Sequence, residues 1–521
     1  TNIIKTTTKT VFRDAQGLHE FTGNVLITGS GSANSASLQI DNPDSNSFNH
    51  SIEAFAANLT NGESNVILVG KEGSTKNTGY IGYYWTASGS NNNYVSLGHW
   101  AADHLFRVYG DSVLSTVTLR SDVDMQSPIF YDKLAPDIRW PSPACGNISK
   151  IQYGPRKVIE KISIEVDGNE NETVNEGLSA SSIKSLNKDK ILNDLMKANL
   201  LSFIKSRPFN KIANPNEIPR DIFISGINSE PLSCDLEFVL SNSLPEFQAG
   251  LDVLANLTDG KVHLTLKEDS VFISSLENVD LHSISGPHPC GNVGIQIHHI
   301  SPLKPNEIIW TIDPQHVVIL GKFFLTGRFD PSILVSIGGP IFSKPKYIRT
   351  IIGASIKSSI IDQDLIENHR LISGSILNGV TSSINESLHF YDTCLSGITL
   401  SEERKFMGMI YPGNSDTHYS LTNTFVNLDK KPFNFSTLTN GSERPIYPLG
   451  YWEDVLPMDI LPNELYRSIV SEDIELMENL GILECDEEDF SLCTFSCASK
   501  IDVGSMIRKG LDMIWNEKNQ I

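Results

Sequence analysis

Long hydrophobic runs are the first feature that this chain of 521 residues lacks. A helix needs roughly 20 consecutive apolar residues to cross a bilayer, and no segment of the sequence approaches that length. The polar start, Thr1 to Lys5, also lacks the apolar region of a secretory signal peptide. The sequence therefore predicts a folded chain that makes membrane contact only through partner proteins.

Positive charge is scarce. Lysine and arginine together number 41 against 62 aspartates and glutamates, so the formal net charge is -21. Proteins that bind nucleic acid need a basic face to neutralise the phosphates, and no basic run is visible here. The charge balance therefore argues against nucleic acid as a partner.

Cysteine is sparse as well, and its spacing argues against two classes of site. The seven cysteines do not form the short paired spacings of a zinc site or of a small disulfide scaffold. Cys493 and Cys497 are close, but two thiols cannot hold an iron–sulfur cluster that takes four cysteines. We expect reduced thiols in the cytoplasm and no metal site. The cysteines occupy positions 145, 234, 290, 394, 485, 493 and 497.

Residues 1–125 contain no cysteine and no proline after Pro43, and they are rich in serine, asparagine, glycine and threonine. Short β-prone runs between glycine turns predict a β-sandwich-like segment. It is similar to the β-rich modules of viral and phage structural proteins. Its alternating aromatics are expected in a core rather than in a carbohydrate-stacking platform. The predicted strands are 65–69, 79–85, 94–100 and 105–109, and the aromatics are Tyr83, Tyr84, Trp85 and Trp100.

Downstream of residue 126 the amino-acid composition and the local pattern change. Short strands joined by Pro/Gly turns fit part of a barrel-sandwich hybrid, but no lysine sits in the tight hairpin that carriers of this fold modify, so no covalent prosthetic group is expected. After a polar linker, helical spacing alternates with apolar strands, which predicts an α/β layer. The predicted helices are 188–201 and 246–257, and the predicted strands include 262–266 and 271–274.

The most specialised stretch is Gly286 to Ile300, where glycines, prolines and histidines precede an apolar run. Glycines permit close backbone approach to a ligand, and prolines stiffen the turn between them. Residues 297–300 are predicted as a strand, which would point His298 and His299 to opposite faces. A structural role for these histidines is favoured over a metal-binding role. A dinucleotide-binding glycine motif with its strand and helix is absent, so a direct NADH site is not expected.

The C-terminal part of the sequence, from Pro462 onward, is predicted to form helices. Pro462 is predicted at the first position of one helix, with Ser471 capping the next and Gly481 ending it. The acidic run 486–489 is interpreted as helix capping rather than catalysis. Apolar residues at helical spacing predict a final helix packed on its own protein. These residues are Val503, Ile507, Leu511 and Ile514.

Several motifs are spread along about residues 126–521. They include Ser142-Pro-Ala-Cys-Gly146, Arg207-Pro-Phe209, Pro219-Arg-Asp221, Gly286-Pro-His-Pro-Cys-Gly291, Ile297-His-His299, Trp310-Thr-Ile312, Gly338-Gly-Pro340, Arg370-Leu-Ile-Ser-Gly374, Val455-Leu-Pro-Met-Asp-Ile-Leu-Pro462 and Asp486-Glu-Glu-Asp-Phe-Ser-Leu-Cys-Thr-Phe495. Together they resemble one family, the NqrA subunits of the sodium-translocating NADH:quinone oxidoreductases.

The resemblance implies a non-autonomous enzyme component on the cytoplasmic side of the bacterial inner membrane. It implies ubiquinone as substrate, no covalently bound cofactor, and NADH, flavin and iron–sulfur centres in the partner subunits of the complex. A quinone headgroup needs apolar walls and a few hydrogen-bond donors, which the specialised stretch offers. The candidate quinone-binding residues are Gly286, Pro287, His288, Pro289, Gly291, His298 and His299.

The expected fold class is α+β and multidomain. The family's own N-terminus is expected before residue 127, where the β-rich segment stands instead, so the sequence reads as a fusion. The alternative function is a structural or carbohydrate-binding β-module with a passenger downstream. The expected domains are a β-rich module (1–125), a partial barrel-sandwich hybrid (126–167), a linker (168–185), a Rossmann-like α/β domain (186–340), a β-grasp, SLBB-like domain (341–435) and a helical C-terminus (436–521).

Overall fold

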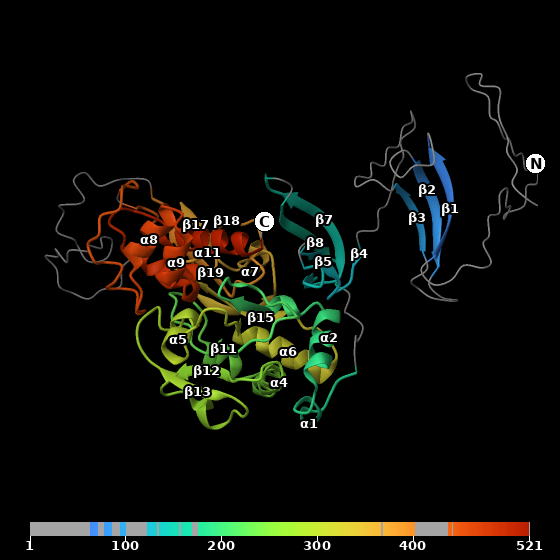
Figure 1. The fold of residues 1–521 in the computed structure, drawn as a ribbon, viewed down its shortest axis with the longest axis horizontal. Coiled ribbons are helices and arrows are strands. Elements are labelled where there is room, and N and C mark those ends of the chain that lie inside the picture. The colour runs from blue at the N-terminus through green and yellow to red at the C-terminus, as the bar shows by residue number, and fades with distance from the viewer. Residues whose placement is uncertain are drawn as a thin grey trace, which may run out of the picture. The chain divides into compact units, whose positions relative to one another are not determined.

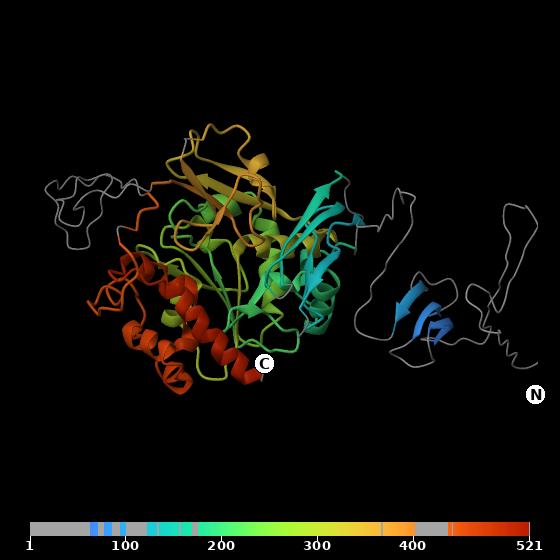
Figure 2. The same cartoon turned by 90° about the horizontal axis from the view of Figure 1, so that it is seen from above.

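The computed structural model divides the chain into two compact units, Thr1–Val117 and Thr118–Ile521. Figures 1 and 2 show the described elements from two directions. No helix among these described residues is long and apolar enough to span a bilayer. The structure describes residues 63–70, 78–85, 94–99, 122–132, 135–155, 158–168, 176–365, 368–401, 436–439 and 441–519.

The described part of the first unit is one antiparallel sheet in the order β1-β2-β3. Asn65 pairs with Tyr83, and Tyr84 pairs with Tyr94. Three of the predicted strands are therefore confirmed. The predicted strand 105–109 and the placement of the four aromatic side chains lie outside the described residues. The strands are β1 (Glu63–Gly70), β2 (Thr78–Trp85) and β3 (Tyr94–His99).

The second unit begins with short antiparallel strands, as the proline and glycine turns predict. One sheet has the order β4-β7-β8, and β5 pairs with β6. The rings of Phe130 and Trp140 stack at 4.5 Å between centroids, and Trp140 Nε1 donates to Tyr391 Oη at 3.0 Å. These strands are thereby attached to a later part of the chain. Their bounds are β4 (Asp122–Val123), β5 (Pro128–Tyr131), β6 (Arg139–Pro141), β7 (Gly146–Tyr153) and β8 (Ile159–Val166).

A six-stranded sheet in the order β10-β9-β14-β11-β12-β13 forms the centre of the α/β layer. Strands β11 to β14 run parallel, and β9 is antiparallel to β14. The strands are β9 (Ile204–Arg207), β10 (Lys211–Ile212), β11 (Asp221–Ser225), β12 (Val262–Lys267), β13 (Asp280–Ile284) and β14 (Ile309–Ile312). The chain moves outward from β11 to β13 and then returns to the other side of β11. This reversal is the kind of switch point at which open α/β sheets bind ligands.

Helices cover both faces of this sheet. Ile222 and Ile224 of β11 pack into the core that contains α4 and α6, whereas Phe223, on the opposite face, packs against Ile297 of α5. The stretch predicted as a strand at 271–274 is a 3-10 helix, because Ser270 accepts from the amide of Phe272 and starts a tight turn. The helices are α1 (Ala180–Ile183), α2 (Lys188–Lys197), η2 (Leu201–Phe203), α3 (Leu236–Leu240), α4 (Leu244–Ala255), η3 (Val271–Ser274), α5 (Val293–Ile300) and α6 (Pro314–Thr326).

Close approach of α4 and α6 depends on glycine. A Cβ atom at Gly321 would fall on the backbone carbonyl of Glu246, and one at Gly250 would meet the carbonyl of Val317. We expect Gly321→Ala to force the helices apart and to lower the free energy of unfolding by about 3 kcal/mol, the upper part of the range for overpacked cores. Urea unfolding followed by tryptophan fluorescence measures this. Gly441→Ala is the control, since its Cβ would have no neighbour nearer than 3.6 Å; equal midpoints in the two variants would contradict the prediction.

The next segment is a five-stranded sheet in the order β16-β15-β19-β17-β18, consistent with the predicted β-grasp. A turn before β18 closes through the Gly379 amide, which donates to the carbonyl of Ser375 at 2.8 Å. The elements are β15 (Ser332–Gly338), β16 (Lys346–Ile351), α7 (Ile356–Ser359), β17 (His369–Ser373), β18 (Val380–Ser382) and β19 (Cys394–Thr399).

The C-terminal helices form a separate core that also takes in Ile295 of α5. Pro462 begins α8, as predicted, but Ser471 ends that helix, and Asp473 caps α9 by accepting from Leu476 N. The predicted apolar stripe of α11 is buried in this core, which confirms that it packs on its own protein. The elements are α8 (Pro462–Val470), α9 (Ile474–Asn479), η5 (Ile482–Glu484), η6 (Glu487–Phe490), α10 (Ser491–Ser496) and α11 (Val503–Asn519).

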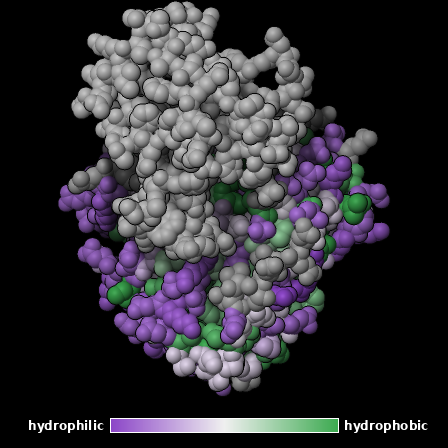
Figure 3. All heavy atoms as spheres, turned by 90° about the vertical axis from the view of Figure 1, so that its right-hand side faces the viewer, coloured by the Kyte–Doolittle hydropathy of each residue, from purple (hydrophilic) through white to green (hydrophobic). Residues whose placement is uncertain are grey.

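All seven cysteines are free, and six of them are buried. Within the described ranges, no group of three or more His, Cys, Asp or Glu side chains could hold a metal ion. On the face drawn in Figure 3, the coloured residues are mainly hydrophilic, with hydrophobic side chains in small separate groups. Such a mixture is usual for a surface that faces water.

Candidate functional site

The Gly-Pro-His-Pro loop connects the end of β13 to the start of α5. The following His298-His299 pair lies in the last turn of α5, so the prediction of a strand at 297–300 is wrong. Ile295 and Ile297 of α5 are buried against two different cores, which favours a helix although the local sequence is β-prone. Successive side chains on a helix still point in different directions, so the two imidazoles separate here too.

Gly291 anchors the loop to the end of β11. Its amide donates to Ser229 Oγ at 2.9 Å, and a Cβ atom at this position would lie 2.6 Å from both Ser229 N and Ser229 Oγ. Gln296 adds a second tie, since its Nε2 donates to the carbonyl of Cys290 at 3.1 Å and to Ser225 Oγ at 2.8 Å. The loop therefore has little freedom to leave the strand ends.

His288 is held from both sides. Its Nδ1 lies 3.0 Å from Ser229 Oγ, and its Nε2 lies 3.5 Å from Ser491 Oγ of the C-terminal helices. Burial lowers the pKa of His288 to about 4, so the imidazole is neutral at neutral pH. This neutral ring joins the α/β layer to the C-terminal domain.

The other two candidate histidines have different surroundings. His299 Nε2 donates to the carbonyl of Pro457 at 2.8 Å, which makes Nδ1 its lone-pair atom. His298 uses both ring nitrogens, with Nδ1 at 2.9 Å from Glu484 Oε2 and Nε2 accepting from Asp459 N at 3.1 Å. His298 therefore links α5 to the C-terminal domain through both ring nitrogens. His299 uses only Nε2, so its Nδ1 can still accept a hydrogen bond.

A cleft of about 900 Å³ opens between this loop, α5 and the segment 453–457. Its walls combine apolar side chains and prolines with three imidazoles, three hydroxyl groups, one thiol and, on one side, the carboxylates of Glu453 and Asp454. This composition suits a flat, weakly polar ligand that needs few hydrogen bonds. The lining residues are Thr265, Leu281, His282, Ser283, Ile284, Ser285, Gly286, Pro287, His288, Pro289, Cys290, Ile295, His299, Ile300, Glu453, Asp454, Val455, Leu456, Pro457 and Leu492.

The structure brings five of the seven predicted site residues to this cleft and leaves two outside it. Gly286, Pro287, His288, Pro289 and His299 line it. The sixth, glycine 291, lines a neighbouring cavity instead. The seventh, histidine 298, lines neither of the two cavities. The loop prediction therefore locates a cavity, and the helix decides which histidine faces it.

The neighbouring cavity, of about 330 Å³, lies at the switch point of the sheet. It is lined by Ser225 and Ile227, at and just after the end of β11, by Ile312 and Asp313, at and just after the end of β14, and by Arg207. The first turn of α5 also borders it, and helix N-termini attract negative charge. Glu230, Asp313 and Asp392 line the cavity, and further negative charge comes from the C-terminal domain.

That charge belongs to the acidic turn, residues 486–489, which the sequence predicts as a helix cap. It forms a capping box within itself, which confirms that prediction. Arg207 Nη2 also lies 3.0 Å from Asp486 Oδ2 and 3.1 Å from Glu488 Oε1. A Cβ atom at Gly294 of α5 would meet the carboxylate of Asp489. The turn therefore does more than cap a helix, since it docks the C-terminal domain on the α/β layer.

Burial raises the pKa of the Glu488 carboxyl, and the neighbouring Asp486 raises it further, while Arg207 opposes both. Burial and Glu488 raise the pKa of Asp489 well above its usual value. Burial would lower the pKa of Arg207, but the attraction of Asp486, Glu488 and Asp489 outweighs it and raises the value. Arg207 therefore opposes the effect of burial on the acidic turn, and Arg508 Nη1 lies 3.7 Å from Asp486 Oδ1 on another side.

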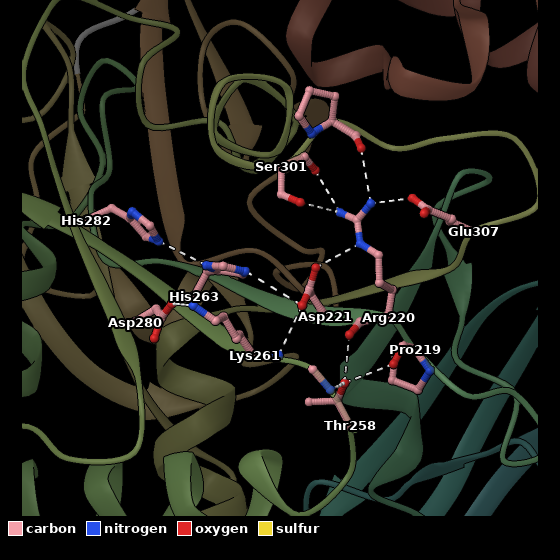
Figure 4. A network of polar contacts seen from close by, with 12 residues as sticks. Pro219, Arg220, Asp221, Thr258, Lys261, His263, Asp280, His282, Ser301 and Glu307 are labelled. Atoms are coloured by element: carbon pink, nitrogen blue, oxygen red, sulfur yellow. Dashed lines mark hydrogen bonds and ion pairs between the residues drawn. The ribbon is translucent and has the colours of Figure 1, made fainter.

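Sequence reasoning missed a second polar feature beside the cleft, a row formed by Asp221, His263 and His282 (Figure 4). His263 Nδ1 and His282 Nε2 are 2.9 Å apart. The signal available in the sequence is His263 itself, an ionisable residue between the apolar Val262 and Leu264 of β12. Buried ionisable groups next to a cavity often mark functional sites.

Comparison with known proteins places these domains. Family models match residues 113–167 (NqrA N-terminal barrel-sandwich hybrid domain), residues 186–329 (NqrA second alpha/beta domain) and residues 334–383 (NQRA C-terminal domain). The second of these matches includes the Gly-Pro-His-Pro loop and α5. A solved NAD+-reducing nickel–iron hydrogenase aligns with a TM-score of 0.33 and 12% identity over 43% of this chain and 49% of that chain, which is too weak for any conclusion.

Curated relatives agree with the family models. The NqrA subunit of the Na(+)-translocating NADH-quinone reductase of Pasteurella multocida is 35% identical over 75% of this chain and 87% of its own length. The corresponding subunits of Rhodopirellula baltica and Glaesserella parasuis are 36% and 37% identical, covering 76% and 75% of this chain and 88% and 87% of their own. This chain therefore belongs to the NqrA family of Na(+)-translocating NADH-quinone reductase subunits.

Proposed function

We propose that this chain is the ubiquinone-binding NqrA subunit of a sodium-translocating NADH:ubiquinone oxidoreductase. It lies peripherally on the cytoplasmic side of the bacterial inner membrane and supports electron transfer from NADH to quinone coupled to Na⁺ export. NADH, flavin and iron–sulfur centres belong to the partner subunits. Membership of the family supports the reaction class, and the cleft beside the Gly-Pro-His-Pro loop supports the role within it.

The observation that carries the proposal is the composition of that cleft. A quinone headgroup is flat and apolar except for its carbonyl and methoxy oxygens, and pockets for such ligands combine apolar walls with few polar groups. Here Ile284, Ile295 and Leu456 are among the apolar walls, and His282 and His299 supply the imidazoles. The cleft volume of about 900 Å³ is within the usual range of ligand pockets, roughly 300–1,000 Å³.

The two imidazoles suit the two redox states of the ligand. The lone-pair Nδ1 of His299 accepts a hydrogen bond from a quinol hydroxyl. His282 Nε2 is taken up by His263, so the remaining Nδ1–H of His282 donates to a quinone carbonyl when His263 is the donor of that pair. His288 contributes shape rather than a hydrogen bond, because both of its nitrogens already contact serines.

Binding of a short-tailed ubiquinone tests the proposal. The buried Trp452 precedes the cleft residues 453–457, so its fluorescence should report occupancy. We expect saturable quenching in the full chain and about tenfold weaker binding in His299→Leu, the loss of roughly 1.4 kcal/mol that follows from removing one hydrogen bond.

The matched control is His389→Leu, a half-exposed histidine whose side chain is 51% exposed and which does not line the cleft. It should leave the affinity for ubiquinone unchanged. Lack of saturation in the natural chain, or equal affinities in His299→Leu and the natural chain, would overturn the assignment of the cleft.

A further inference from the structure

The row of Asp221, His263 and His282 crosses three neighbouring parallel strands (Figure 4). Asp221 begins β11, His263 is the second residue of β12, and His282 lies in the middle of β13. His263 is in register with Phe223 on one side and with Asp280 on the other, and its ring stacks on that of Phe223 at 4.4 Å between centroids. The sheet itself therefore fixes the order of the three polar side chains.

Distances along the row are short. His282 Nε2 lies 2.9 Å from His263 Nδ1, and His263 Nε2 lies 3.8 Å from Asp221 Oδ1. Asp221 Oδ2 accepts from Arg220 Nε at 2.8 Å. Arg220 in turn pairs with Glu307. Hydrogen bonds thus join His282 to His263 and Asp221 to Arg220, and a gap of 3.8 Å separates His263 from Asp221.

The two ends of this line have different environments. At one end His282 lines the 900 Å³ cleft, and among the described residues its Nδ1 makes no hydrogen bond. At the other end the side chains of Arg220 and Glu307 are 25% and 27% exposed, so water reaches them. His263, between the ends, is 7% exposed. The row therefore lies between the partly exposed Arg220–Glu307 pair and the cleft that His282 lines.

A purely structural role explains His263 poorly. Its buried Nε2 has no hydrogen-bond partner, and an unsatisfied buried polar atom costs about 1–3 kcal/mol. Burial lowers the pKa of His263, Asp221 and Asp280 act in the opposite direction, and His282 and Lys261 lower it further. The ring is accordingly neutral at neutral pH, with one nitrogen able to give a proton and the other able to take one.

We propose that Asp221, His263 and His282 form a proton relay that delivers one of the two protons taken up when quinone is reduced in the cleft. This inference rests on the proposed function. Quinone accepts two electrons, which NADH supplies through the partner subunits, and two protons. His282 gives the proton on Nδ1 to a quinone oxygen, His263 passes its Nδ1 proton to His282 Nε2, and His263 Nε2 takes a proton that enters from solvent past Asp221. The net result is one proton moved from water to the quinone.

The relay is tested in the assembled reductase with NADH and a short-tailed ubiquinone. His263→Gln retains a polar side chain of similar length but cannot pass a proton between two nitrogens. We expect the rate of quinol formation to fall on the order of 10²-fold, the usual contribution of a positioned proton donor. The dissociation constant for ubiquinone should stay within about twofold, since a change of 1.4 kcal/mol is needed for tenfold. His282→Gln, on the edge strand, should lower the rate similarly, and His389→Gln is the control.

Two further readouts separate a relay from a structural role. Added imidazole should restore part of the rate in His263→Ala, which vacates the space of the ring, and the solvent deuterium isotope effect should rise in His263→Gln because proton delivery becomes limiting. A normal rate in both glutamine variants, or a lost rate without imidazole rescue and without a larger isotope effect, would overturn the relay. Failure of the proposed function would give a different result. Ubiquinone would then bind equally to the natural chain and to His299→Leu, whether or not His263 or His282 is replaced.

Discussion

Arg207→Met is expected to detach the C-terminal domain from the α/β layer at a cost of about 3–5 kcal/mol, the usual result of removing one partner from a buried ion pair. The Arg207 and Asp486 side chains are 4% and 0% exposed, so water cannot replace the lost contact. Asn210 Nδ2 still donates to Asp486 Oδ2 at 2.6 Å, and Arg508 Nη1 stays 3.7 Å from Asp486 Oδ1, but a neutral amide and one more distant cation do not balance several carboxylates. Methionine fills a similar volume, so the effect reports charge rather than a cavity.

The loss of stability caused by Arg207→Met should depend on pH. The folded-state pKa values of Glu488 and Asp489 are raised above their unfolded values, by burial first. A carboxyl group whose pKa is higher in the folded than in the unfolded state stabilises the fold while it is protonated. This contribution is complete below the unfolded-state pKa and is lost as the pH rises through the folded-state pKa. Without Arg207 these pKa values rise further, so the cost should be larger at pH 8 than at pH 5.

Hydrogen exchange of α8 and α11, corrected for the intrinsic effect of pH, measures this prediction because it reports local opening of the C-terminal domain. Arg467→Met is the matched control. Its ion pair with Glu464 has side chains that are 49% and 52% exposed, and such surface pairs contribute about 0–1 kcal/mol. Equal protection in the two variants, or a deficit that grows as the pH falls, would contradict the role assigned to Arg207.

Gly291→Val is expected to give the second large effect, a loss of ubiquinone affinity of up to about 10²-fold. A Cβ atom at position 291 would lie 2.6 Å from Ser229 N and 2.9 Å from the carbonyl oxygen of Ile227. Both are backbone atoms of the segment that follows β11 and cannot rotate away as the end of a flexible side chain could, so the loop that contains Gly291 must move instead. Overpacking of this kind costs about 1–3 kcal/mol, and 2.7 kcal/mol corresponds to about a hundredfold change in affinity.

Titration of short-tailed ubiquinone against Trp452 fluorescence measures the loss. Gly441→Val is the control, because nothing approaches a Cβ there more closely than 3.6 Å. Ser229→Ala separates the clash from the hydrogen bond. It removes the acceptor of the Gly291 amide without adding bulk, so we expect a smaller loss of about 1 kcal/mol. Unchanged affinity in Gly291→Val would show that the loop position is not needed for binding.

Local patterns predicted most elements correctly where one periodicity dominates. The helix at α4, the buried strand β12 and the stripe of α11 follow directly from hydrophobic spacing. The same reasoning failed at 297–300, where Ile-His-His-Ile is compatible with either structure. There the helix is favoured because it buries Ile295 and Ile297 in two cores that lie on different sides of α5.

The candidate site divides in the same way. Its loop is visible in the sequence, since the glycines and prolines of Gly-Pro-His-Pro-Cys-Gly carry backbone preferences that do not depend on distant residues. The partners of that loop are not visible. Ser229 and Ser491, which hold His288, lie 59 and 203 residues away along the chain, and no local pattern links them.

The sequence by itself determined the family, the acidic and reduced character of the chain, the α/β core and the loop at the site, because these depend on composition and on residues close together in the chain. Only the tertiary structure decided that His299 rather than His298 faces the cleft, that the acidic turn docks on Arg207, and that Asp221, His263 and His282 form one row. Each of these depends on strand order and domain packing, which bring together side chains from 19 to 281 residues apart.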